Sequence, residues 1–288
     1  MTAFRWLHLT DLHFGMAGQA HLWPNVEEAF FNDLKLLHER VGSWDLVLFS
    51  GDITQRGTKA EFDRVDALLQ KMWSRFEDWG FTPTLLAIPG NHDLARPSDP
   101  SNATLINLLH NWHLPAVHGP FWKDSKCPQR RLVSKAFSPF EEWLRNTKIP
   151  KPEGLKRGLL PGDCSAGFKV KGGGFNVGVI GLNSAYLQLV EGNFERKLAM
   201  DVRQLHAVCD GHAPDWTKQF DVCLLATHHP TQWLNEDSAK QFTEEIHFPA
   251  ERFALHLFGH MHEADLTSIA QGGGSERRTL QGASLLVC

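Results

Sequence analysis

The chain has 288 residues, of which 42% are hydrophobic, 22% charged and 10% aromatic, which is the composition of a folded globular protein and not of a disordered or collagen-like one. Its 29 Lys and Arg residues against 33 Asp and Glu give a formal net charge of -4, which excludes the chain-wide basic charge of many nucleic-acid-binding proteins. No stretch approaches the roughly 18 apolar residues of a membrane span, and the first residues lack the basic and apolar regions of a signal peptide.

The first ninety residues alternate short apolar runs with longer amphipathic ones. We expect strands at residues 4–9, 46–49 and 84–88, and helices at residues 26–41 and 60–79, where apolar residues recur at helical spacing. This β-α-β-α-β order predicts a sheet covered by helices, with ligands gathered where the strands end.

Residues 95–165 interrupt this alternation with nine prolines. We expect two helices there, near residues 103–112 and 138–147, in an insertion that lies over the edge of the sheet. Residues 123–171 carry twelve Lys and Arg against five Asp and Glu, an excess of seven positive charges. This excess is either a solvated face or a surface for a polyanionic substrate. The candidate contacts are Arg130, Arg131, Lys156 and Arg157, with Phe121 and Trp122 as candidate walls of a substrate groove.

Strand patterns return in the second half of the chain. We expect strands at residues 167–170, 175–182, 222–227 and 253–258, and a helix near residues 199–209. The tail from residue 264 is expected to form further strands around a turn at residues 271–274, and it ends in an apolar strand at residues 283–288. At this length one domain covering residues 1–288 is the expected organisation.

The five cysteines are odd in number and form no Cys-x-x-Cys pair. This pattern argues against a disulfide framework and against a zinc ribbon, and it favours a reducing, cytoplasmic location.

Polar motifs follow five of the expected strands by one or two residues. They are Asp11-Leu12-His13, Gly51-Asp52, Gly90-Asn91-His92-Asp93, His228-His229 and Gly259-His260-Met261-His262. Neighbouring strands of a mainly parallel sheet would bring these groups to one edge. Imidazoles, carboxylates and an amide oxygen, with no thiolate among them, suit borderline divalent metals, and the donors suffice for two ions.

The spacing within the motifs has a chemical reason. Alternate residues at a strand end can point to the same side, so Asp11 and His13 can reach one ion, and His260 and His262 can reach adjacent ions. The two oxygens of Asp52 can bridge a pair of ions. Glycines at positions 51, 90 and 259 let the backbone turn sharply beside the metals.

Together, and in this order, the five motifs resemble those of the calcineurin-like metallophosphoesterase family, from about residue 7 to residue 262. The resemblance implies an α/β fold, a four-layer α-β-β-α sandwich of two facing mixed sheets flanked by helices, with the metal site at the strand ends. It implies two divalent metal ions, with Mn²⁺ favoured and Fe or Zn as alternatives. One ion would be held by Asp11, His13, Asp52 and His262, and the other by Asp52, Asn91, His228 and His260.

The resemblance also implies roles for the neighbouring residues. His92 would contact the substrate and protonate the leaving oxygen or stabilise phosphoryl charge, with Asp93 orienting it. Adjacent strand residues face opposite ways, so the choice between His228 and His229 as ligand stays open. We favour His228, and expect His229 to orient a neighbour or to reach the substrate.

A metal-dependent phosphoesterase is the first expectation, acting by in-line attack of a hydroxide held between the two ions. The form Asp11-Leu12-His13-Phe14-Gly15 departs from the Asp-x-His-Gly of the family's protein phosphatases. It looks more like the prokaryotic branch with cyclic-nucleotide phosphodiesterases and DNA-repair nucleases. A phosphodiesterase is therefore favoured, with hydrolysis of phosphomonoesters as the alternative. The expected substrate is a cyclic nucleotide, another nucleotide or a nucleic acid, and no membrane partner is expected. The basic insertion favours a polyanion, whereas the overall negative charge disfavours one.

The alternative expectation belongs to another class. The chain stops abruptly in an apolar run at Cys288, which suggests the N-terminal domain of a longer multidomain signalling protein. In that case the module would regulate or sense, with further domains as its partners.

Overall fold

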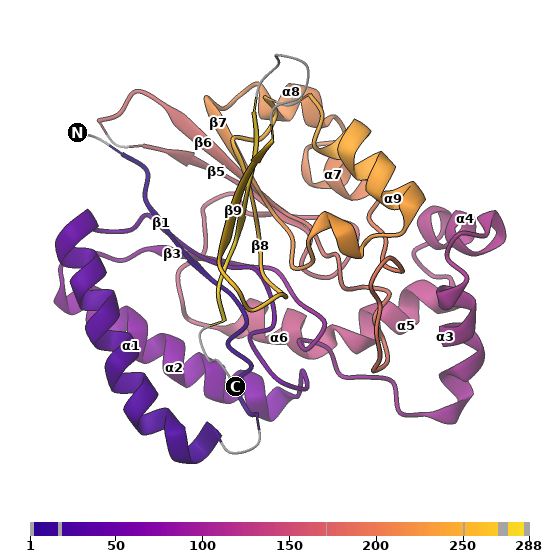
Figure 1. The fold of residues 1–288 in the computed structure, drawn as a ribbon, viewed down its shortest axis with the longest axis horizontal. Helices are drawn as coiled ribbons and strands as arrows, with labels where there is room; N and C mark the ends of the chain where they lie inside the picture. Colours follow the sequence, from indigo (N-terminus) through magenta and orange to yellow (C-terminus); the bar gives the residue numbers. More distant parts are fainter. Residues whose placement is uncertain (1–2, 17–18, 171, 250, 270–275, 285–288) are drawn as a thin grey trace.

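The computed structural model describes residues 3–16, 19–170, 172–249, 251–269 and 276–284. Two β-sheets face one another in the middle of the molecule, and helices cover the outer side of each sheet (Figure 1). The expected four-layer α-β-β-α arrangement is confirmed.

The smaller sheet consists of three parallel strands in the order β1-β2-β3. They are β1 (Trp6–Leu9), β2 (Leu46–Phe49) and β3 (Thr84–Ala87). The middle strand is buried at all four positions, as expected for an apolar strand covered on both faces. Because Leu9 lies opposite Phe49 and Phe49 opposite Ala87, the residues that follow the three strands emerge at one edge of the sheet.

The larger sheet has seven described strands in the order β4-β5-β6-β7-β8-β10-β9. They are β4 (Lys156–Arg157), β5 (Cys164–Lys169), β6 (Asn176–Gly181), β7 (Val222–Ala226), β8 (Leu255–Phe258), β9 (Asp265–Ile269) and β10 (Arg277–Gln281). Strands β6, β7, β8 and β10 pair in parallel, whereas the β4-β5, β5-β6 and β9-β10 pairs are antiparallel. Mixed pairing is thus confined to this sheet, because the described strands of the smaller sheet are all parallel.

Three apolar clusters hold the layers together. Between the sheets, Leu48 and Leu86 of the smaller sheet share a cluster with Val179 and Leu224 of the larger one. A second cluster joins the outer face of the smaller sheet to its helices. The third lies on the outer face of the larger sheet. Alternate residues of one strand therefore serve different clusters, since successive side chains point to opposite faces.

Helices α1 (Gln19–Val41), α2 (Lys59–Asp78) and α6 (Ser138–Asn146) cover the smaller sheet. A capping box begins α2, in which Thr58 and Glu61 each accept a hydrogen bond from the other's backbone N–H. The larger sheet is covered by α7 (Val202–Val208), α8 (Ala213–Thr217) and α9 (Glu236–Gln241), together with the 3₁₀ turn η2 (Thr231–Trp233) and the π-helical turn η3 (Phe242–Ile246).

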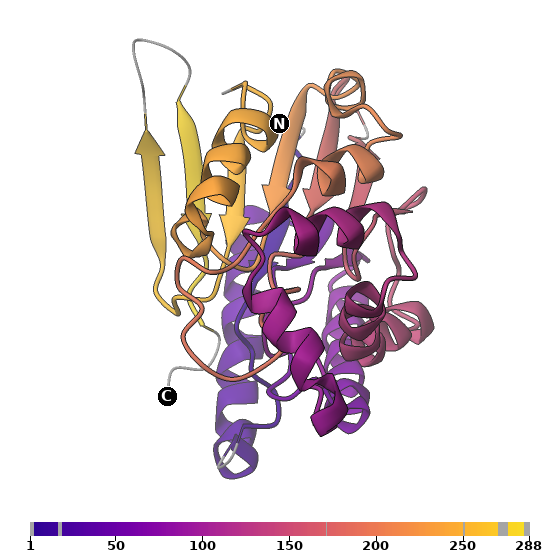
Figure 2. The same cartoon turned by 90° about the vertical axis from the view of Figure 1, so that its right-hand side faces the viewer.

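The insertion is more helical than the sequence indicates (Figure 2). Besides the expected α3 (Ala103–His110) and α6, it contains η1 (Pro100–Asn102), α4 (Pro115–Lys123) and α5 (Pro128–Ala136). Helices α4 and α5 were not predicted, because the prolines at their first turns resemble interruptions of a helical pattern. Pro115 and Pro128 stand at the first turn of their helices, where the missing N–H costs no hydrogen bond.

The insertion shares the two outer cores. Leu109, Phe121 and Val133 belong to the cluster outside the larger sheet, whereas Phe140 and Trp143 of α6 belong to the cluster outside the smaller one. The insertion therefore packs against the outer layers of both sheets and connects them.

Every strand and helix expected within the described residues is present, although α1 begins well before residue 26. The expected turn at residues 271–274 and most of the expected strand at residues 283–288 lie outside the described residues. Among the described residues, no helix combines the length and the apolar character needed to cross a bilayer.

Candidate metal centre

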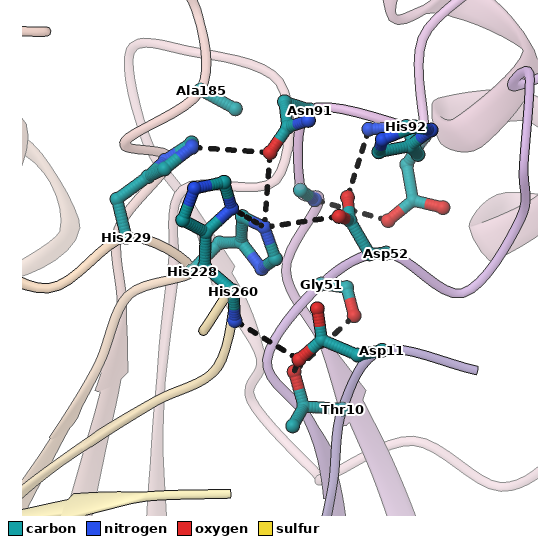
Figure 3. Close-up of polar contacts among 12 residues, drawn as sticks. Thr10, Asp11, Gly51, Asp52, Asn91, His92, Ala185, His228, His229 and His260 are labelled. Atoms are coloured by element: carbon teal, nitrogen blue, oxygen red, sulfur yellow. Dashed lines mark hydrogen bonds and ion pairs between the residues drawn. The ribbon is translucent and has the colours of Figure 1, made fainter. Parts of the chain in front are cut away.

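The motifs that follow five strands meet at one edge of the two sheets (Figure 3). The expected ligands come from the ends of β1, β2, β3, β7 and β8. Eight of the candidate residues form four overlapping groups of three, within each of which the potential ligand atoms lie within 4.8 Å of one another: Asp11, His13, Asp52, His92, His228, His229, His260 and His262. Asn91 joins them, because its Oδ1 lies 3.1 Å from Nε2 of His228. All seven expected ligands are therefore brought together.

The backbone at these positions is strained. Among the described residues, seven that are not glycine have a positive φ, and five of them are expected ligands: Asp11 (52°), His13 (46°), Asp52 (52°), His260 (73°) and His262 (62°). A side chain makes this left-handed conformation costly, so it persists only where the surrounding structure enforces it. Such residues cluster at active sites and ligand clamps. The strain therefore supports a functional role for this edge.

The first group of donors is centred on Asp11, which is fully buried. Its Oδ2 accepts hydrogen bonds from Thr10 Oγ1 (2.7 Å) and from the backbone N–H of His260 (2.9 Å). Its Oδ1 has no hydrogen-bond partner and lies 3.7 Å from Nε2 of His13 and 3.5 Å from Nε2 of His262. One carboxylate oxygen is thus fixed by the protein, and the other points at two imidazole nitrogens.

The second group is centred on Asp52. Its Oδ1 accepts a hydrogen bond from the backbone N–H of His92 (2.8 Å), and its Oδ2 lies 3.2 Å from Nε2 of His228 and 3.8 Å from Nε2 of His13. Nδ1 of His260 is 3.3 Å from Nε2 of His228. Asp52 thus lies between the first group and the second, as expected for a bridging ligand.

This donor set fits two divalent ions. Ligands held at about 2.0–2.2 Å from one ion lie roughly 3–3.5 Å from each other, which is close to most of the spacings here. Nε2 of His13 and Nε2 of His262 are only 3.1 Å apart, although two imidazole lone pairs repel each other unless a proton or a cation lies near them. The buried, unpartnered Oδ1 of Asp11 likewise lacks the positive partner that its burial requires.

The tautomer of His228 also suits a ligand. Its Nδ1 donates a hydrogen bond to the backbone carbonyl of Ser50 (2.9 Å), which turns Nε2 towards Asp52 and Asn91. Metal-binding histidines commonly donate their second ring N–H in this way.

His229 forms a hydrogen bond with Asn91 instead. Ser184 Oγ accepts the backbone N–H of His229 (2.9 Å) and lies 3.0 Å from its Nδ1, so the hydroxyl donates to that nitrogen. Nε2 of His229 then carries the proton and donates to Asn91 Oδ1 (3.1 Å). This geometry favours His228 as the ligand and His229 as the residue that orients Asn91.

Electrostatics in the site favour binding of a cation. Burial alone would lower the pKa of His228, but the Asp52 carboxylate, with help from Asp11, raises it to about 9. Burial alone would raise the pKa of Asp52, but the charge of His228 holds it well below its ordinary value. Burial and the neighbouring His228 lower the pKa of His260 to about 3. The Asp52 carboxylate therefore stays charged, and its negative charge attracts a cation.

His92 lies at the rim of the centre, with its ring centroid 4.8 Å from that of His13. Its Nδ1 donates to the backbone carbonyl of Gln55 (2.8 Å), which leaves Nε2 for a substrate. The expectation that Asp93 orients His92 is wrong. The carboxylate of Asp93 accepts hydrogen bonds from the backbone N–H groups of Gly90, Ile53 and Thr54 and from Thr54 Oγ1. Asp93 therefore ties together the loops after β2 and β3, and burial raises its pKa to about 6.

Two glycines are required by close approach. A Cβ at Gly90 would collide with the Asp52 carboxylate, and one at Gly259 would collide with Thr10 and Asp11. These positions are glycine because the carboxylates of neighbouring strands lie directly against the backbone.

Four residues that position the donors were not identified from the sequence. Gln55 and Ser50 act through backbone carbonyls, and Ser184 lies in the loop after β6. Trp233 of η2 packs edge-on against His260, with ring centroids 4.0 Å apart. The carbonyls leave no trace in a sequence pattern, because any residue could supply them.

The expected substrate contacts of the insertion have other partners. Arg130 is buried, donates to the carbonyls of Phe121 and Leu159, and lies over the rings of Phe121 and Trp122. Those two aromatic residues pack with Tyr186, Phe121 within the apolar cluster and Trp122 partly buried against it. Arg131 is exposed on α5. Lys156 pairs with Asp210, and Arg157 with Glu141 (3.4 Å).

Several solved structures are similar to this chain. A dimetal phosphatase from Danio rerio is 10% identical over 99% of this chain and 88% of its own, with a TM-score of 0.47. The sulfate thiohydrolase SoxB from Thermus thermophilus is 15% identical over 99% of this chain and 53% of its own, with a TM-score of 0.45. A 5'-nucleotidase from Candida albicans is 13% identical over 98% of this chain and 47% of its own, with a TM-score of 0.45. The chain thus spans about half the length of the last two.

No curated protein sequence matches this chain. The sequence profile described as calcineurin-like phosphoesterase, however, matches residues 4–264, which include all five motifs and the strands from β1 to β8. The chain belongs to the calcineurin-like phosphoesterase family.

Proposed function

We propose that this protein hydrolyses phosphodiester bonds of nucleotides or nucleic acids with the help of two divalent metal ions. The observation that carries the proposal is the convergence of seven oxygen and nitrogen donors at one sheet edge, five of them on strained backbone. A site of this composition suits Mn²⁺, Fe or Zn, of which we favour Mn²⁺. The four described cysteines that are free and buried are compatible with a reducing cytoplasm.

Asp11, His13, Asp52 and His262 would hold one ion, and Asp52, Asn91, His228 and His260 the other. Bound there, the ions would neutralise charge on the phosphoryl oxygens and activate a water molecule for in-line attack. Ser50 fixes the tautomer of His228, and His229 holds Asn91 in place.

His92 supplies the remaining chemistry. The carbonyl of Gln55 holds its Nδ1–H, so Nε2 is the atom that delivers a proton to the leaving oxygen. Asp93 contributes indirectly, because its carboxylate holds together the loops that carry Asp52 and His92.

A diester is favoured over a phosphoprotein by the Asp11-Leu12-His13-Phe14-Gly15 form of the first motif. The test is a panel of substrates assayed with metal-reconstituted protein: an aryl phosphomonoester, an aryl phosphodiester, cyclic nucleotides, and single- and double-stranded DNA and RNA. We expect turnover of diesters above that of the monoester. A preference for the monoester would contradict the diesterase assignment. Tight nucleotide binding without any turnover would instead favour a sensing module.

A further inference from the structure

A cavity of about 400 Å³ opens beside the metal centre and shares two residues with it. Asn91 and His92 form one wall, and the other walls include Arg56, Leu94, Arg96 and Glu191. Since His92 acts on the leaving oxygen, a phosphoester whose phosphoryl group lies at the metal donors directs its leaving group into this cavity.

Arg96 is the more constrained of the two arginines. Its Nη1 donates to Glu191 Oε1 (2.8 Å), while its Nε is buried and has no hydrogen-bond partner. Buried N–H groups in proteins are nearly always paired, so the Nε–H of Arg96 is a donor that a further acceptor in the cavity could satisfy. The side chain of Glu191 is 86% exposed, and an ion pair to so exposed a carboxylate is weak. Arg96 can therefore exchange this partner for an anion in the cavity.

Arg56 provides a second positive charge. Its backbone N–H donates to Glu61 Oε2 (3.0 Å), which anchors the residue to the start of α2. Its side chain is exposed, and within the described part of the chain its guanidinium makes no hydrogen bond or ion pair. One guanidinium group can donate two parallel hydrogen bonds to the oxygens of a phosphate. Arg56 and Arg96 together therefore suit a phosphate better than a single cation would.

The arginines that line the cavity differ from three of the residues expected to contact a substrate. Arg130, Lys156 and Arg157 already bond to carbonyls or to acidic side chains. The cavity is lined by two arginines, Arg56 and Arg96, and by the exposed carboxylate of Glu191. The positive charge beside His92 therefore comes from Arg56 and Arg96.

We propose that this arginine pocket, formed by Arg56, Arg96 and Glu191, binds a second phosphate carried by the leaving group of the substrate. The proposal rests on the proposed function and narrows it to substrates with at least two phosphates. In the reaction, the oxygen of water bonds to the phosphorus and the water gives up one proton to solvent, while the bond from phosphorus to the leaving oxygen breaks. The leaving oxygen takes the proton from Nε2 of His92, and solvent then returns a proton to His92. The phosphate of the departing alcohol stays paired with Arg96.

The experiment compares thymidine dinucleotides that differ only in a terminal phosphate. Metal-loaded protein is assayed with TpT, with pTpT and with TpTp, and the ratio of kcat/KM between phosphorylated and plain dinucleotide is measured for each. One of the two phosphorylated forms should exceed TpT roughly tenfold to hundredfold, the effect of a charge-assisted hydrogen bond. Thymidine diphosphate provides a further arm, since preference for it over both dinucleotides would assign the second phosphate to an anhydride and not to a nucleic-acid strand.

Variants locate the effect. Arg96→Gln should bring the ratio close to one, and Arg56→Gln should lower it less. Glu191→Gln removes the competing carboxylate and should raise the ratio. Arg278→Gln is the matched control, because Arg278 also pairs with a glutamate (Glu276, 2.9 Å) but lies on β10, towards the end of the strand away from the site, and should leave the ratio as in the wild type.

A binding measurement distinguishes a wrong assignment of the arginine pocket from a wrong assignment of the phosphodiesterase function. Affinity for thymidine 3',5'-bisphosphate relative to thymidine 5'-monophosphate is measured by calorimetry, which requires no turnover. Equal affinities, or a wild-type ratio of one with all diesters cleaved, would overturn the pocket and leave the phosphodiesterase intact. A different outcome is that no diester is cleaved, but the bisphosphate binds more tightly than the monophosphate and Arg96→Gln removes this difference in affinity. That outcome would support the arginine pocket and contradict the proposed phosphodiesterase function.

Discussion

The sheet edge that carries the expected metal ligands and the basic insertion are both rich in polar groups, but they place these groups differently. At the edge, buried carboxylates and imidazoles point at one another across strand ends, with unpartnered atoms and left-handed backbone. In the insertion, Arg130, Lys156 and Arg157 bond to carbonyls or acidic side chains of their own surroundings. The difference teaches that a cluster of polar residues indicates a site when its polar groups are left unsatisfied, and structure when they are satisfied.

Replacing Asp52 should reduce metal binding and turnover more than any other change proposed at the sheet edge. Asp52→Ala deletes the carboxylate shared by both donor groups, so metal content should fall and turnover should drop by at least about 10³-fold. Elemental analysis after reconstitution measures the first effect, and the diesterase assay the second. Asp63→Ala, which removes an exposed aspartate of α2, is the control. A fully loaded Asp52→Ala protein would show that the two donor groups do not share a bridging ligand.

His92→Ala should be almost as damaging to turnover but should leave the ligands in place. Loss of a positioned proton donor lowers the rate by about 10²–10⁴-fold, while metal content should match the wild type. His113→Ala, an exposed histidine of the insertion, is the control. If His92→Ala also loses metal, His92 is a ligand and its assignment as proton donor is wrong.

A methyl group at Gly90 should disturb the edge without removing any donor. Its Cβ would collide with the carboxylate and the backbone N of Asp52, so we expect a loss of about 1–3 kcal/mol in the free energy of unfolding together with reduced metal binding. Gly119→Ala in α4 meets open space and should be close to neutral. Equal stability of the two variants in urea denaturation would contradict the close packing of the strand ends.

Substitutions in the insertion should lower the free energy of unfolding and should not change the preference between substrates. Arg130→Met leaves the buried carbonyl of Phe121 and the half-buried carbonyl of Leu159 without their donor and should cost about 1–3 kcal/mol. The exposed Arg131→Gln should stay within about 0.5 kcal/mol. Neither change, nor Lys156→Gln with Arg157→Gln, should alter the ratio of oligonucleotide to aryl diester hydrolysis among folded molecules. A fall in that ratio would restore the insertion as a substrate surface and weaken the contrast.

Much of the fold and of the candidate site followed from local pattern. Apolar runs at residues 46–49 and 84–88 are long enough for buried strands, and each is followed by polar residues that an apolar core accepts only with polar partners. The motifs therefore mark strand ends, and parallel pairing then places those ends at one edge. The insertion was harder to predict, because Pro115 and Pro128 both interrupt a pattern and begin a helix, and sequence periodicity does not distinguish the two roles.

The sequence by itself determined the elements, the motifs and the family, because side-chain periodicity and the donor set are properties of residues that are close along the chain. Tertiary structure alone decided that His228 and not His229 faces Asp52, that Gln55 and not Asp93 holds His92, and that Arg96 borders the site while Arg130 is buried elsewhere. Each of these outcomes depends on atoms that come together only when the two sheets pack, such as His228 Nδ1 on Ser50 O, 178 residues apart. Pairing over such separations is set by packing of the whole chain, which no local pattern contains.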